Sequence, residues 1–297
     1  IRTIGAGGFG IVELVEDDGG NQYARKTFRV NQAANADAAF VEHVQKRFNR
    51  EALIQSGLNH NNIVPVIDSD INAKPPYFLM PVAAASLEQD MAQSRDLNGE
   101  FLNAIMDILA GLEEIHSLRI YHRDLKPQNV LRFDTPEGSK YSISDFGLMS
   151  VSDTQITVLT QVGMAMGSDM YTAPEIVDDL RLATPMSDIY SLGCILHGLI
   201  GSSRRIPCNE INDDTSIYAH IISVCTRKDP NRRFKSVSDL RDAILSVSLS
   251  GRVAETAEAS SLANKLLSYG PITAADWEAT ISYIENRFGS DDCNLLF

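Results

Sequence analysis

The sequence predicts an α+β fold in which antiparallel strands come first and helices follow. Residues 1–30 hold short stretches that alternate apolar and polar side chains, and the run Asp17–Asn21 among them is a strong turn signal. Apolar residues recur at helical spacing in residues 36–57, 101–118 and 189–200. With 297 residues, the chain can bury a large core as one two-lobed unit or as two domains.

Composition and charge exclude one broad class of function. An apolar fraction of 44% and a charged fraction of 22% are typical of globular proteins. The net charge of −13 argues against a general nucleic-acid binder, because such a protein needs a basic surface that releases counterions from phosphates. The same charge favours basic segments as binding partners.

The cysteines and the apolar runs predict a cytoplasmic chain without a membrane segment. The four cysteines show neither metal-type spacing nor a dense disulfide framework, so reduced thiols are expected. The longest apolar run, residues 189–200, is too short to span a bilayer, and no secretory signal is visible. Because Ile1 opens directly on a glycine loop, the chain is expected to be a fragment of a longer protein.

A glycine-rich loop joins the first two predicted strands. Its residues are Gly5, Ala6, Gly7, Gly8, Phe9 and Gly10. Because the loop connects two strands, it differs from dinucleotide-binding loops, which follow a strand and open a helix. Glycines let backbone N–H groups approach phosphate oxygens, although a flexible hairpin would also explain the motif. Lys26, in the third predicted strand, strengthens the phosphate-binding interpretation.

The following elements alternate in type before the chain becomes helical. Residues 36–57 predict a helix that ends at a glycine and carries Glu51. Its apolar residues are Phe40, Val41, Val44, Phe48, Leu53 and Ile54. Residues 63–67 and 77–80 are strand-like. Beyond residue 100, helices are expected over residues 101–118, 189–200, 217–225 and 237–245.

Residues 120–129 form the loop in which polar chemistry gathers. Pro127 interrupts any helix there, so the segment is predicted to be a rigid loop before a short strand. Asp124 can accept a proton from a hydroxyl, Lys126 can neutralise a phosphate, and the amide oxygen of Asn129 can bind a hard cation. A polar surface loop is the plain alternative, and the surrounding motifs decide between the two.

Four motifs, in order and spacing, resemble those of eukaryotic-type Ser/Thr protein kinases. They are the glycine loop followed by Lys26, the run His122–Asn129, the run Asp145–Gly147 and the run Ala173–Glu175. The resemblance implies a bilobal protein-kinase fold. Its N-lobe would have an antiparallel sheet with one main helix, and its C-lobe would be mostly helical.

The resemblance also implies domain boundaries along the chain. It covers residues 1 to about 247. Residues 1–80 are expected to form the N-lobe, residues 81–85 the hinge, and residues 86–250 the C-lobe. Residues 251–297 are expected to form a helical C-terminal extension.

An ATP site between the lobes follows from the resemblance. The glycine loop would cover the triphosphate, and Lys26, held by Glu51, would orient it. The backbone of Val82 would bond the adenine, because Pro81 has no N–H. The apolar side chains expected around the purine are Val12, Ala24, Met80 and Leu131.

The resemblance assigns the catalytic roles as well. Asp124 would deprotonate the acceptor hydroxyl and Lys126 would offset charge on the transferred phosphoryl group. Asn129 and Asp145 would hold Mg²⁺, with Mn²⁺ as the alternative ion. A lysine two residues after the base is similar to Ser/Thr kinases, so transfer from Mg-ATP to serine or threonine of protein substrates is implied.

Regulation is expected in the segment after Asp145–Gly147. Thr157 and Thr160 are the leading phosphorylation candidates there, although loop hydroxyls of this kind are common. Arg123 would receive the phosphorylated residue through a bidentate contact, which orders the loop. This implies autophosphorylation of the activation segment.

Three further expectations concern structure rather than chemistry. Glu175 should pair with the buried Arg233. The connection 201–214 is short for the family, so either its usual helix is trimmed or residues are absent from the numbered chain. His122 is expected to be an internal scaffold residue. Gln55 stands where the family usually has an apolar residue. It is expected to weaken the active position of its helix, so that activity depends on phosphorylation or a partner.

The C-terminal stretch predicts two amphipathic helices. Thr273 with Asp276 is an acceptable N-terminal cap for the second of them. Its apolar residues are Trp277, Ile281, Ile284 and Phe288. The extension is expected to pack on the C-lobe, and a docking role for a regulatory partner is the alternative.

Two other classes of function compete with a protein kinase. A pseudokinase scaffold would bind nucleotide without transfer. Such proteins usually lack the counterpart of Lys26, Asp124 or Asp145, whereas this chain has all three residues. A small-molecule phosphotransferase would share the base and the metal ligands. The segment ending at Ala173–Glu175 argues against it, because it resembles a peptide-docking segment.

Overall fold

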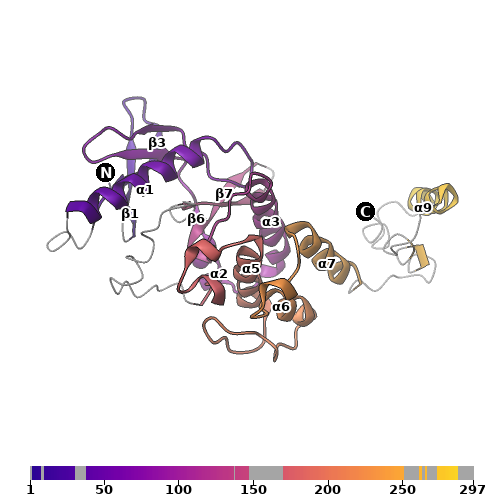
Figure 1. Cartoon of the computed structure of the whole chain (residues 1–297). Helices are drawn as coiled ribbons and strands as arrows, with labels where there is room; N and C mark the ends of the chain where they lie inside the picture. Colours follow the sequence, from indigo (N-terminus) through magenta and orange to yellow (C-terminus); the bar gives the residue numbers. More distant parts are fainter. Residues whose placement is uncertain are drawn as a thin grey trace. The chain divides into compact units, whose positions relative to one another are not determined.

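The computed structural model describes most of the chain as two compact units. The described residues are 2–7, 10–30, 38–136, 138–146, 170–250, 261–262, 265 and 273–286. The first unit comprises residues 1–240 and the second residues 241–297. Figure 1 traces the elements along the chain, from strands at the N-terminus to helices after them. The α+β class predicted from the sequence is confirmed.

The first unit begins with a five-stranded antiparallel sheet in the order β1-β2-β3-β5-β4. Its strands are β1 (Arg2–Ala6), β2 (Gly10–Glu16), β3 (Gln22–Phe28), β4 (Asp68–Asp70) and β5 (Tyr77–Met80). The predicted turn joins β2 to β3, where the Asp17 carboxylate accepts from the backbone N–H groups of Gly19 and Asn21. Gly20 completes it with φ of 82°, a conformation that favours glycine.

Helix α1 (Ala38–Ser56) packs its inner face on this sheet. Val44 and Phe48 are buried, and the Phe48 ring lies 5.4 Å from that of Phe78 in β5. Leu53, which the apolar pattern includes, is instead 57% exposed. The buried face continues through Glu51 and Gln55, because these lie one turn apart on the side that faces the sheet. This prediction from periodicity was therefore wrong at Leu53.

The strand expected over residues 63–67 is displaced along the chain. Residues 64–67 are irregular, and β4 begins only at Asp68. Pro65 cannot donate to a sheet ladder, which explains why regular pairing starts beyond it. Ile63 and Val64 instead pair with Ile143, since the Val64 N–H donates to the Ile143 carbonyl at 3.0 Å.

The rest of the first unit is mostly helical, with one small sheet. Its strands, in the order β6-β7-β8, are β6 (Ala85–Ser86), β7 (Val130–Thr135) and β8 (Gly138–Ile143). Its helices are α2 (Leu87–Gln93), α3 (Phe101–Ser117), α5 (Pro185–Ile200), α6 (Ala219–Cys225) and α7 (Val237–Ser250), the last of which crosses into the second unit.

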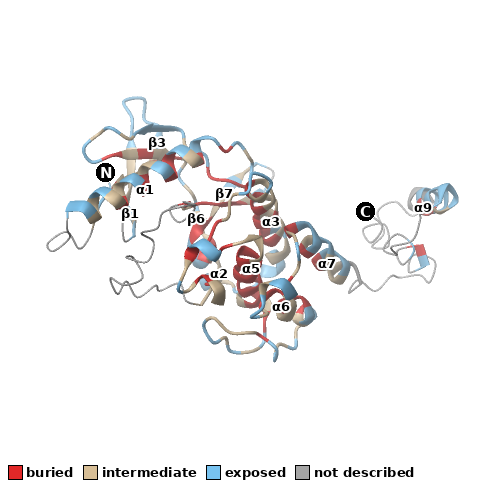
Figure 2. Ribbon diagram, viewed as in Figure 1, coloured by how far each residue is buried: buried red, intermediate tan, exposed pale blue. Residues whose placement is uncertain are grey.

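Helix α5 is the central element of the helical part. It begins after Thr184, whose N–H donates to Ser187 Oγ at 3.2 Å. Pro185 stands in its first turn, where a missing N–H leaves no donor unpaired. Almost every residue after that turn is buried, as Figure 2 shows. The short connection after it, residues 201–214, is fully described and contains no helix.

The second unit includes α9 (Ala274–Asn286). The predicted cap is present, because the Asp276 N–H donates to Thr273 Oγ1 at 3.3 Å and the Thr273 N–H donates to Asp276 Oδ2 at 3.0 Å. The predicted apolar face was wrong: Trp277 and Ile281 are 50% and 52% exposed. Thr280 is buried instead, as is Tyr283. Ile284 and Phe288 lie outside the described side chains.

No helix in the described ranges is both long enough and apolar enough to cross a bilayer.

Candidate active site

Lys26 in β3 joins two acidic residues from different parts of the chain. Its Nζ lies 2.6 Å from Glu51 Oε1 on α1 and 3.2 Å from Asp145 Oδ1, which follows β8. The side chain of Glu51 is 4% exposed and that of Asp145 is 46% exposed. The pairing of Lys26 with Glu51 that the sequence predicts is thus present. It connects the N-terminal sheet and α1 to the residues after β8.

Two carboxylates share one ammonium group in this cluster, and the pKa values reflect that. Burial alone would lower the pKa of Lys26, but Asp145 and Glu51 outweigh it and raise the pKa above its usual range. Burial also acts to raise the pKa of Asp145, yet Lys26 holds it below its ordinary value. Burial raises the pKa of Glu51 despite Lys26. Of the two carboxylates, Glu51 is the less exposed, and it is the one whose pKa is raised.

Asp124, Lys126 and Asn129 face one another in the loop before β7. Lys126 Nζ lies 2.6 Å from Asp124 Oδ2. Asn129 Nδ2 donates to the Asp124 carbonyl at 2.8 Å and to its Oδ2 at 3.2 Å. Residues Pro127–Asn129 form a short 3₁₀ turn with the proline at its start, so the expected rigid loop has helical character at its end. The Asp124 carboxylate is held in place by a cation and an amide.

The β7–β8 hairpin brings the loop and Asp145 together. Val130 is paired with Ile143, and Ser144 donates through its N–H to the Asn129 carbonyl at 2.8 Å. Asn129 and Asp145 are therefore close neighbours across the start of the hairpin. Asp145 has a φ of 65°, which is uncommon for a residue other than glycine. Strained backbone of this kind concentrates at functional sites.

The donor set at Asn129 and Asp145 suits a hard divalent cation. Asp145 supplies a charged carboxylate, and the Asn129 amide oxygen is neutral, which matches the oxygen ligands that Mg²⁺ accepts. Within the described part of the chain, no cluster of three or more His, Cys, Asp or Glu side chains could hold a metal ion by itself. A cation at this site would take its remaining ligands from phosphate oxygens and water.

The apolar residues expected around a purine also come together. Ala24 in β3 and Met80 at the end of β5 are buried and lie opposite each other in the sheet. Val12 and Leu131 pack against the same cluster from β2 and β7. Val82, in the segment after β5, is 37% exposed. The four apolar side chains thus belong to one cluster, although they come from separate strands.

The glycine loop is described except at its tip. Gly7 donates through its N–H to the Gly10 carbonyl at 2.9 Å, which closes the turn between β1 and β2. Gly5 and Ala6 are in β1, opposite Val12 and Ile11. Gly8 and Phe9 lie outside the described residues, as do the phosphorylation candidates Thr157 and Thr160.

Asp188, at the start of α5, positions the loop that contains Asp124. Its Oδ2 accepts from the His122 N–H at 2.8 Å and its Oδ1 from the Arg123 N–H at 2.9 Å. His116 Nε2 lies 2.8 Å from Oδ2. Burial would raise the pKa of Asp188, but His116 and the backbone donors outweigh it and lower the pKa. The sequence motifs assign no role to Asp188, although a carboxylate that opens an apolar helix needs a partner.

His122 and Arg123, two residues of the same loop, are both buried. The His122 Nε2 donates to the Ser144 carbonyl at 3.0 Å, and its ring lies 5.5 Å from that of Phe146. These contacts agree with an internal scaffold. Arg123 has a φ of 67°, and burial lowers its pKa although Asp188 counteracts this.

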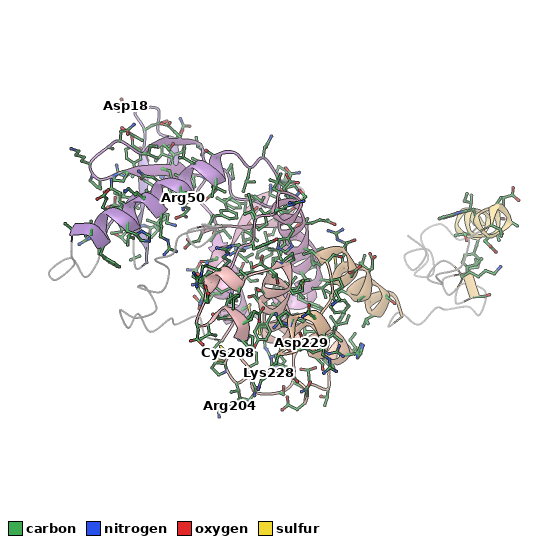
Figure 3. All side chains as sticks on the ribbon, viewed as in Figure 1. Asp18, Arg50, Arg204, Cys208, Lys228 and Asp229 are labelled. Carbon is green, nitrogen blue, oxygen red and sulfur yellow. The ribbon has the colours of Figure 1, made fainter. Side chains whose placement is uncertain are left out.

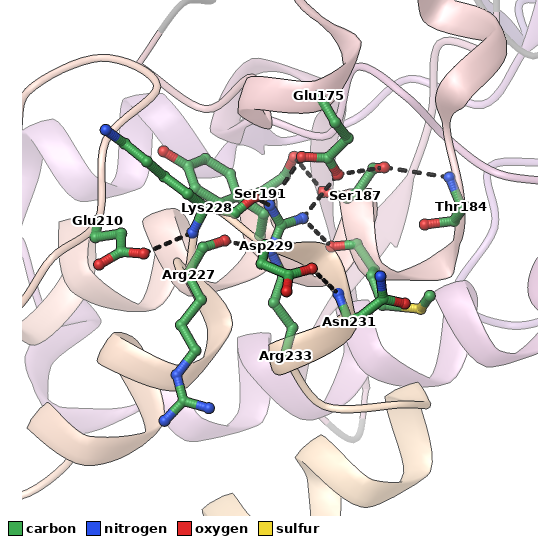
Figure 4. A network of polar contacts seen from close by, with 12 residues as sticks. Glu175, Thr184, Ser187, Ser191, Glu210, Arg227, Lys228, Asp229, Asn231 and Arg233 are labelled. Carbon is green, nitrogen blue, oxygen red and sulfur yellow. Dashed lines mark hydrogen bonds and ion pairs between the residues drawn. The ribbon is translucent and has the colours of Figure 1, made fainter.

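Glu175 and Arg233 form the predicted ion pair, shown in Figure 4. The contact is bidentate, with Arg233 Nη1 and Nη2 at 2.7 and 2.8 Å from the two carboxylate oxygens. Ser187 Oγ donates to the same carboxylate at 2.8 Å, and Arg233 Nη1 also donates to the Met186 carbonyl. The guanidinium side chain is fully buried. The pair fastens the residues after Ala173 to α5.

Gln55 makes a contact that its sequence position does not suggest. Its side chain is fully buried one turn after Glu51, and its Nε2 donates to the Val64 carbonyl at 2.7 Å. The same nitrogen lies 3.8 Å from the Met80 sulfur, while Oε1 is buried without a hydrogen-bond partner. The polar side chain thus bonds α1 to the segment paired with Ile143.

Comparison with known proteins identifies a family that the sequence of this chain matches. The family model described as "Protein kinase domain" matches residues 1–275. The chain is 37% identical over 205 residues to the probable serine/threonine-protein kinase PknB of Lactococcus lactis, which covers 67% of this chain and 31% of that protein. It is 30% identical over 266 residues to the serine/threonine-protein kinase PrkC of Bacillus subtilis, covering 81% of this chain and 39% of that protein.

A fungal protein shows the same similarity. The mitogen-activated protein kinase mpkC of Aspergillus oryzae is 31% identical over 208 residues, which cover 70% of this chain and 56% of that protein. The chain thus spans between about a third and just over half of the length of these relatives.

Proposed function

This chain belongs to the protein kinase family, and we propose that it transfers the γ-phosphoryl group of Mg-ATP to serine or threonine hydroxyls of protein substrates. The observation that carries the proposal is the pair of contacts from Lys26 to Glu51 and Asp145. Through them the sheet, α1 and the residue after β8 converge on one place. The Ser144 N–H, which donates to the Asn129 carbonyl, brings the loop that contains Asp124 beside them. Bound nucleotide supplies the phosphoryl group, and the divalent ion offsets its charge.

The residues of the chain position the two substrates and neutralise charge on the phosphates, and none of them forms a covalent bond to the phosphoryl group. Lys26, fully charged because its pKa is raised, orients the α and β phosphates, and Glu51 holds it. Val12, Ala24, Met80 and Leu131 hold the purine, and the backbone of Val82 bonds its edge. The backbone of Gly5–Gly10 covers the phosphates.

The loop before β7 handles the acceptor hydroxyl. Asp124 orients the hydroxyl and takes its proton, because its carboxylate is held ready by Lys126 and Asn129. Lys126 offsets negative charge on the moving phosphoryl group. Asn129 and Asp145 supply two oxygen ligands for Mg²⁺, and Mn²⁺ suits the same ligands.

We also propose that activity is regulated by autophosphorylation of the activation segment at Thr157 or Thr160, with Arg123 as the receiving cation. Arg123 is buried beside the base, where a charge-assisted contact to phosphate would order the neighbouring segment. The division into an N-lobe, a hinge, a C-lobe and an extension belongs to the same proposal, as do a cytoplasmic location and partner docking on the extension.

Transfer from labelled ATP tests the function against its rivals. The chain is incubated with Mg²⁺ and labelled ATP, alone, with myelin basic protein, and with sugars or aminoglycosides. Label in the basic protein or in the chain itself, found on serine or threonine by mass spectrometry, is the expected result. Label only in the small molecules would make the chain a small-molecule phosphotransferase. Nucleotide binding with no transfer to any acceptor would make it a pseudokinase.

A further inference from the structure

Arg205 reaches from the connection after α5 back to the segment that precedes Ala173. Its Nη1 donates to the Met170 carbonyl at 2.9 Å and to the Cys194 carbonyl in α5 at 3.0 Å. Its guanidinium carbon lies 4.4 Å from the centre of the Tyr171 ring. One side chain thus contacts two consecutive residues of this segment and the helix below them.

The chemistry of these contacts requires an arginine. Hydrogen bonds from a charged donor are about twice as strong as those between neutral groups. A planar guanidinium can stack on the Tyr171 ring while its edge donates to carbonyl oxygens. A lysine keeps the charge but has no plane to stack, so it cannot make the same set of contacts.

The segment is fastened at both ends to α5 or to residues after it. Ser191 Oγ donates to the Tyr171 carbonyl at 2.8 Å, next to the contacts of Arg205. At the other end, Glu175 is held by Arg233 and Ser187. Residues 172–173 between these anchors are buried. Their course therefore depends on the two sets of anchors.

We propose that Arg205 is a positioning residue that sets the shape of residues 170–172 for docking of the protein substrate. The inference rests on the proposed kinase function, because it concerns the substrate side of the same site. Arg205 makes its contacts away from Lys26, Glu51 and Asp145, which hold one another independently. Its loss thus weakens the use of the protein substrate and leaves the use of ATP intact.

Steady-state kinetics with myelin basic protein and ATP measure this effect. Arg205→Met keeps the length and the apolar stem of the side chain but removes its donors and its charge. The expected result is a KM for the protein substrate about tenfold higher, with the KM for ATP unchanged. Arg205→Lys is expected to recover part of the loss. Arg204→Met is the matched control, because Arg204 is the exposed neighbour on the outside of the same loop (Figure 3).

Hydrogen exchange provides a readout that does not need catalysis. In Arg205→Met, the backbone amides of residues 170–173 are expected to exchange about tenfold faster than in the wild type, while the amides of α3 keep the wild-type rate. In Arg204→Met, the amides of residues 170–173 are expected to keep the wild-type rate as well. An unchanged KM for the basic protein would overturn the proposal, as would an equal rise in the KM for ATP.

The two proposals fail in different ways. If the wild-type chain transfers no phosphate to any protein, the proposed function fails, and unchanged exchange in the segment would then overturn the role of Arg205 as well. If Arg205→Met does not fold, the same measurements are made on Arg205→Lys. Wild-type values of the KM and of the exchange rates in Arg205→Lys would then overturn the proposal.

Discussion

The Asp124 carboxylate lies in a loop beside a cation and an amide, an arrangement that suits a general base. Lys126 and Asn129 contact the same oxygen, Oδ2, so the carboxylate is oriented before any substrate binds. Such preorganisation lowers the cost of reaching the reactive geometry. Lys26 and Asp145, the other charged residues of the proposed site, lie far from Asp124 along the chain.

Asp124→Asn separates catalysis from nucleotide binding. The amide cannot take up the proton of a hydroxyl, so kcat for a protein substrate is expected to fall by about 100-fold or more. The dissociation constant of a fluorescent ATP analogue is expected to stay near the wild-type value, because Lys26 and Asp145 are untouched. Asp134→Asn, which alters an exposed carboxylate in β7, serves as the control. Wild-type turnover in Asp124→Asn would remove Asp124 from the role of base.

Gln55 is a second residue whose surroundings define a prediction. Gln55→Glu places a carboxylate at a fully buried site, next to the Val64 carbonyl that the amide bonded. The free energy of unfolding at pH 7.5 is expected to fall by about 3 kcal/mol. Burial raises the folded-state pKa of the new acid, so the loss shrinks as pH falls toward the unfolded value near 4.3.

Urea unfolding of this variant at pH 5 and pH 7.5, each against wild type, measures that dependence. Gln93→Glu at an exposed position of α2 is the control, and its change is expected to stay within about 0.5 kcal/mol. A loss that is equal at both pH values would mean that the carboxylate at position 55 is not buried.

Among the elements, α5 holds both the loop of Asp124 and the segment before Glu175. Asp188 at its N-terminal end bonds the backbone of residues 122–123. Ser187 in the same turn bonds Glu175. A helix that is buried almost throughout thus serves as the fixed support for two functional loops.

Asp188→Asn is expected to change how stability depends on acid. Because the folded-state pKa of Asp188 is lowered, its contribution is present above about pH 4 and is lost as pH falls through the folded value. The variant is therefore expected to be about 3 kcal/mol less stable at pH 7, and the difference from wild type to narrow below pH 4. Urea unfolding from pH 7 to pH 3 measures it, with the exposed Asp239→Asn as control. A constant difference over this range would contradict the lowered pKa.

Two glycines of α5 differ in the space around them. A Cβ added at Gly193 would lie 2.4 Å from Cys225 Cβ in α6, whereas one at Gly198 would meet only the flexible end of Met91 at 3.1 Å. Gly193→Ala is expected to cost about 1–3 kcal/mol of unfolding free energy through overpacking of α5 against α6. Gly198→Ala is expected to be nearly neutral, since alanine favours the helix. Equal thermal midpoints in the two variants would show that α6 adjusts without cost.

At the scale of the first unit, Asn62 links the segment after α1 to α3 and β8. The residue follows α1, and its Nδ2 donates to Asp107 Oδ1 in α3 at 2.7 Å and to the Tyr141 carbonyl in β8 at 3.0 Å. Asp107 also accepts from the Tyr141 N–H at 2.8 Å. Gly111 allows this approach, because a Cβ there would lie 2.6 Å from the Asn62 carbonyl.

Asn62→Ala is expected to weaken the cooperativity of unfolding. The substitution removes both contacts and leaves a buried carbonyl with one donor fewer, which costs about 1–3 kcal/mol. Calorimetry is expected to show a broader transition, with a van't Hoff enthalpy below the calorimetric enthalpy, as the sheet and the helical part unfold less together. Asn72→Ala in an exposed turn is the control. A sharp single transition in Asn62→Ala would mean that other contacts couple the unfolding of the sheet to that of the helical part.

The local elements and the short motifs were predictable because the information lies in neighbouring residues. The turn at Asp17–Asn21, the buried face of α3 and the loop of Asp124 each follow from spacing within a few residues. The same kind of pattern was wrong at Leu53, Trp277 and Ile281, which are exposed. Periodicity identifies an apolar stripe, but the neighbouring elements decide which part of it is covered.

The sequence by itself determined the order of the elements and the residue types that a phosphoryl-transfer site requires. Only the tertiary structure decided which charges meet: Lys26 with Asp145, Asp188 with the backbone of the loop, and Arg205 with the segment at Tyr171. The physical reason is that these partners lie far apart along the chain. Their contacts exist only once packing of the core has placed the strands and helices that carry them.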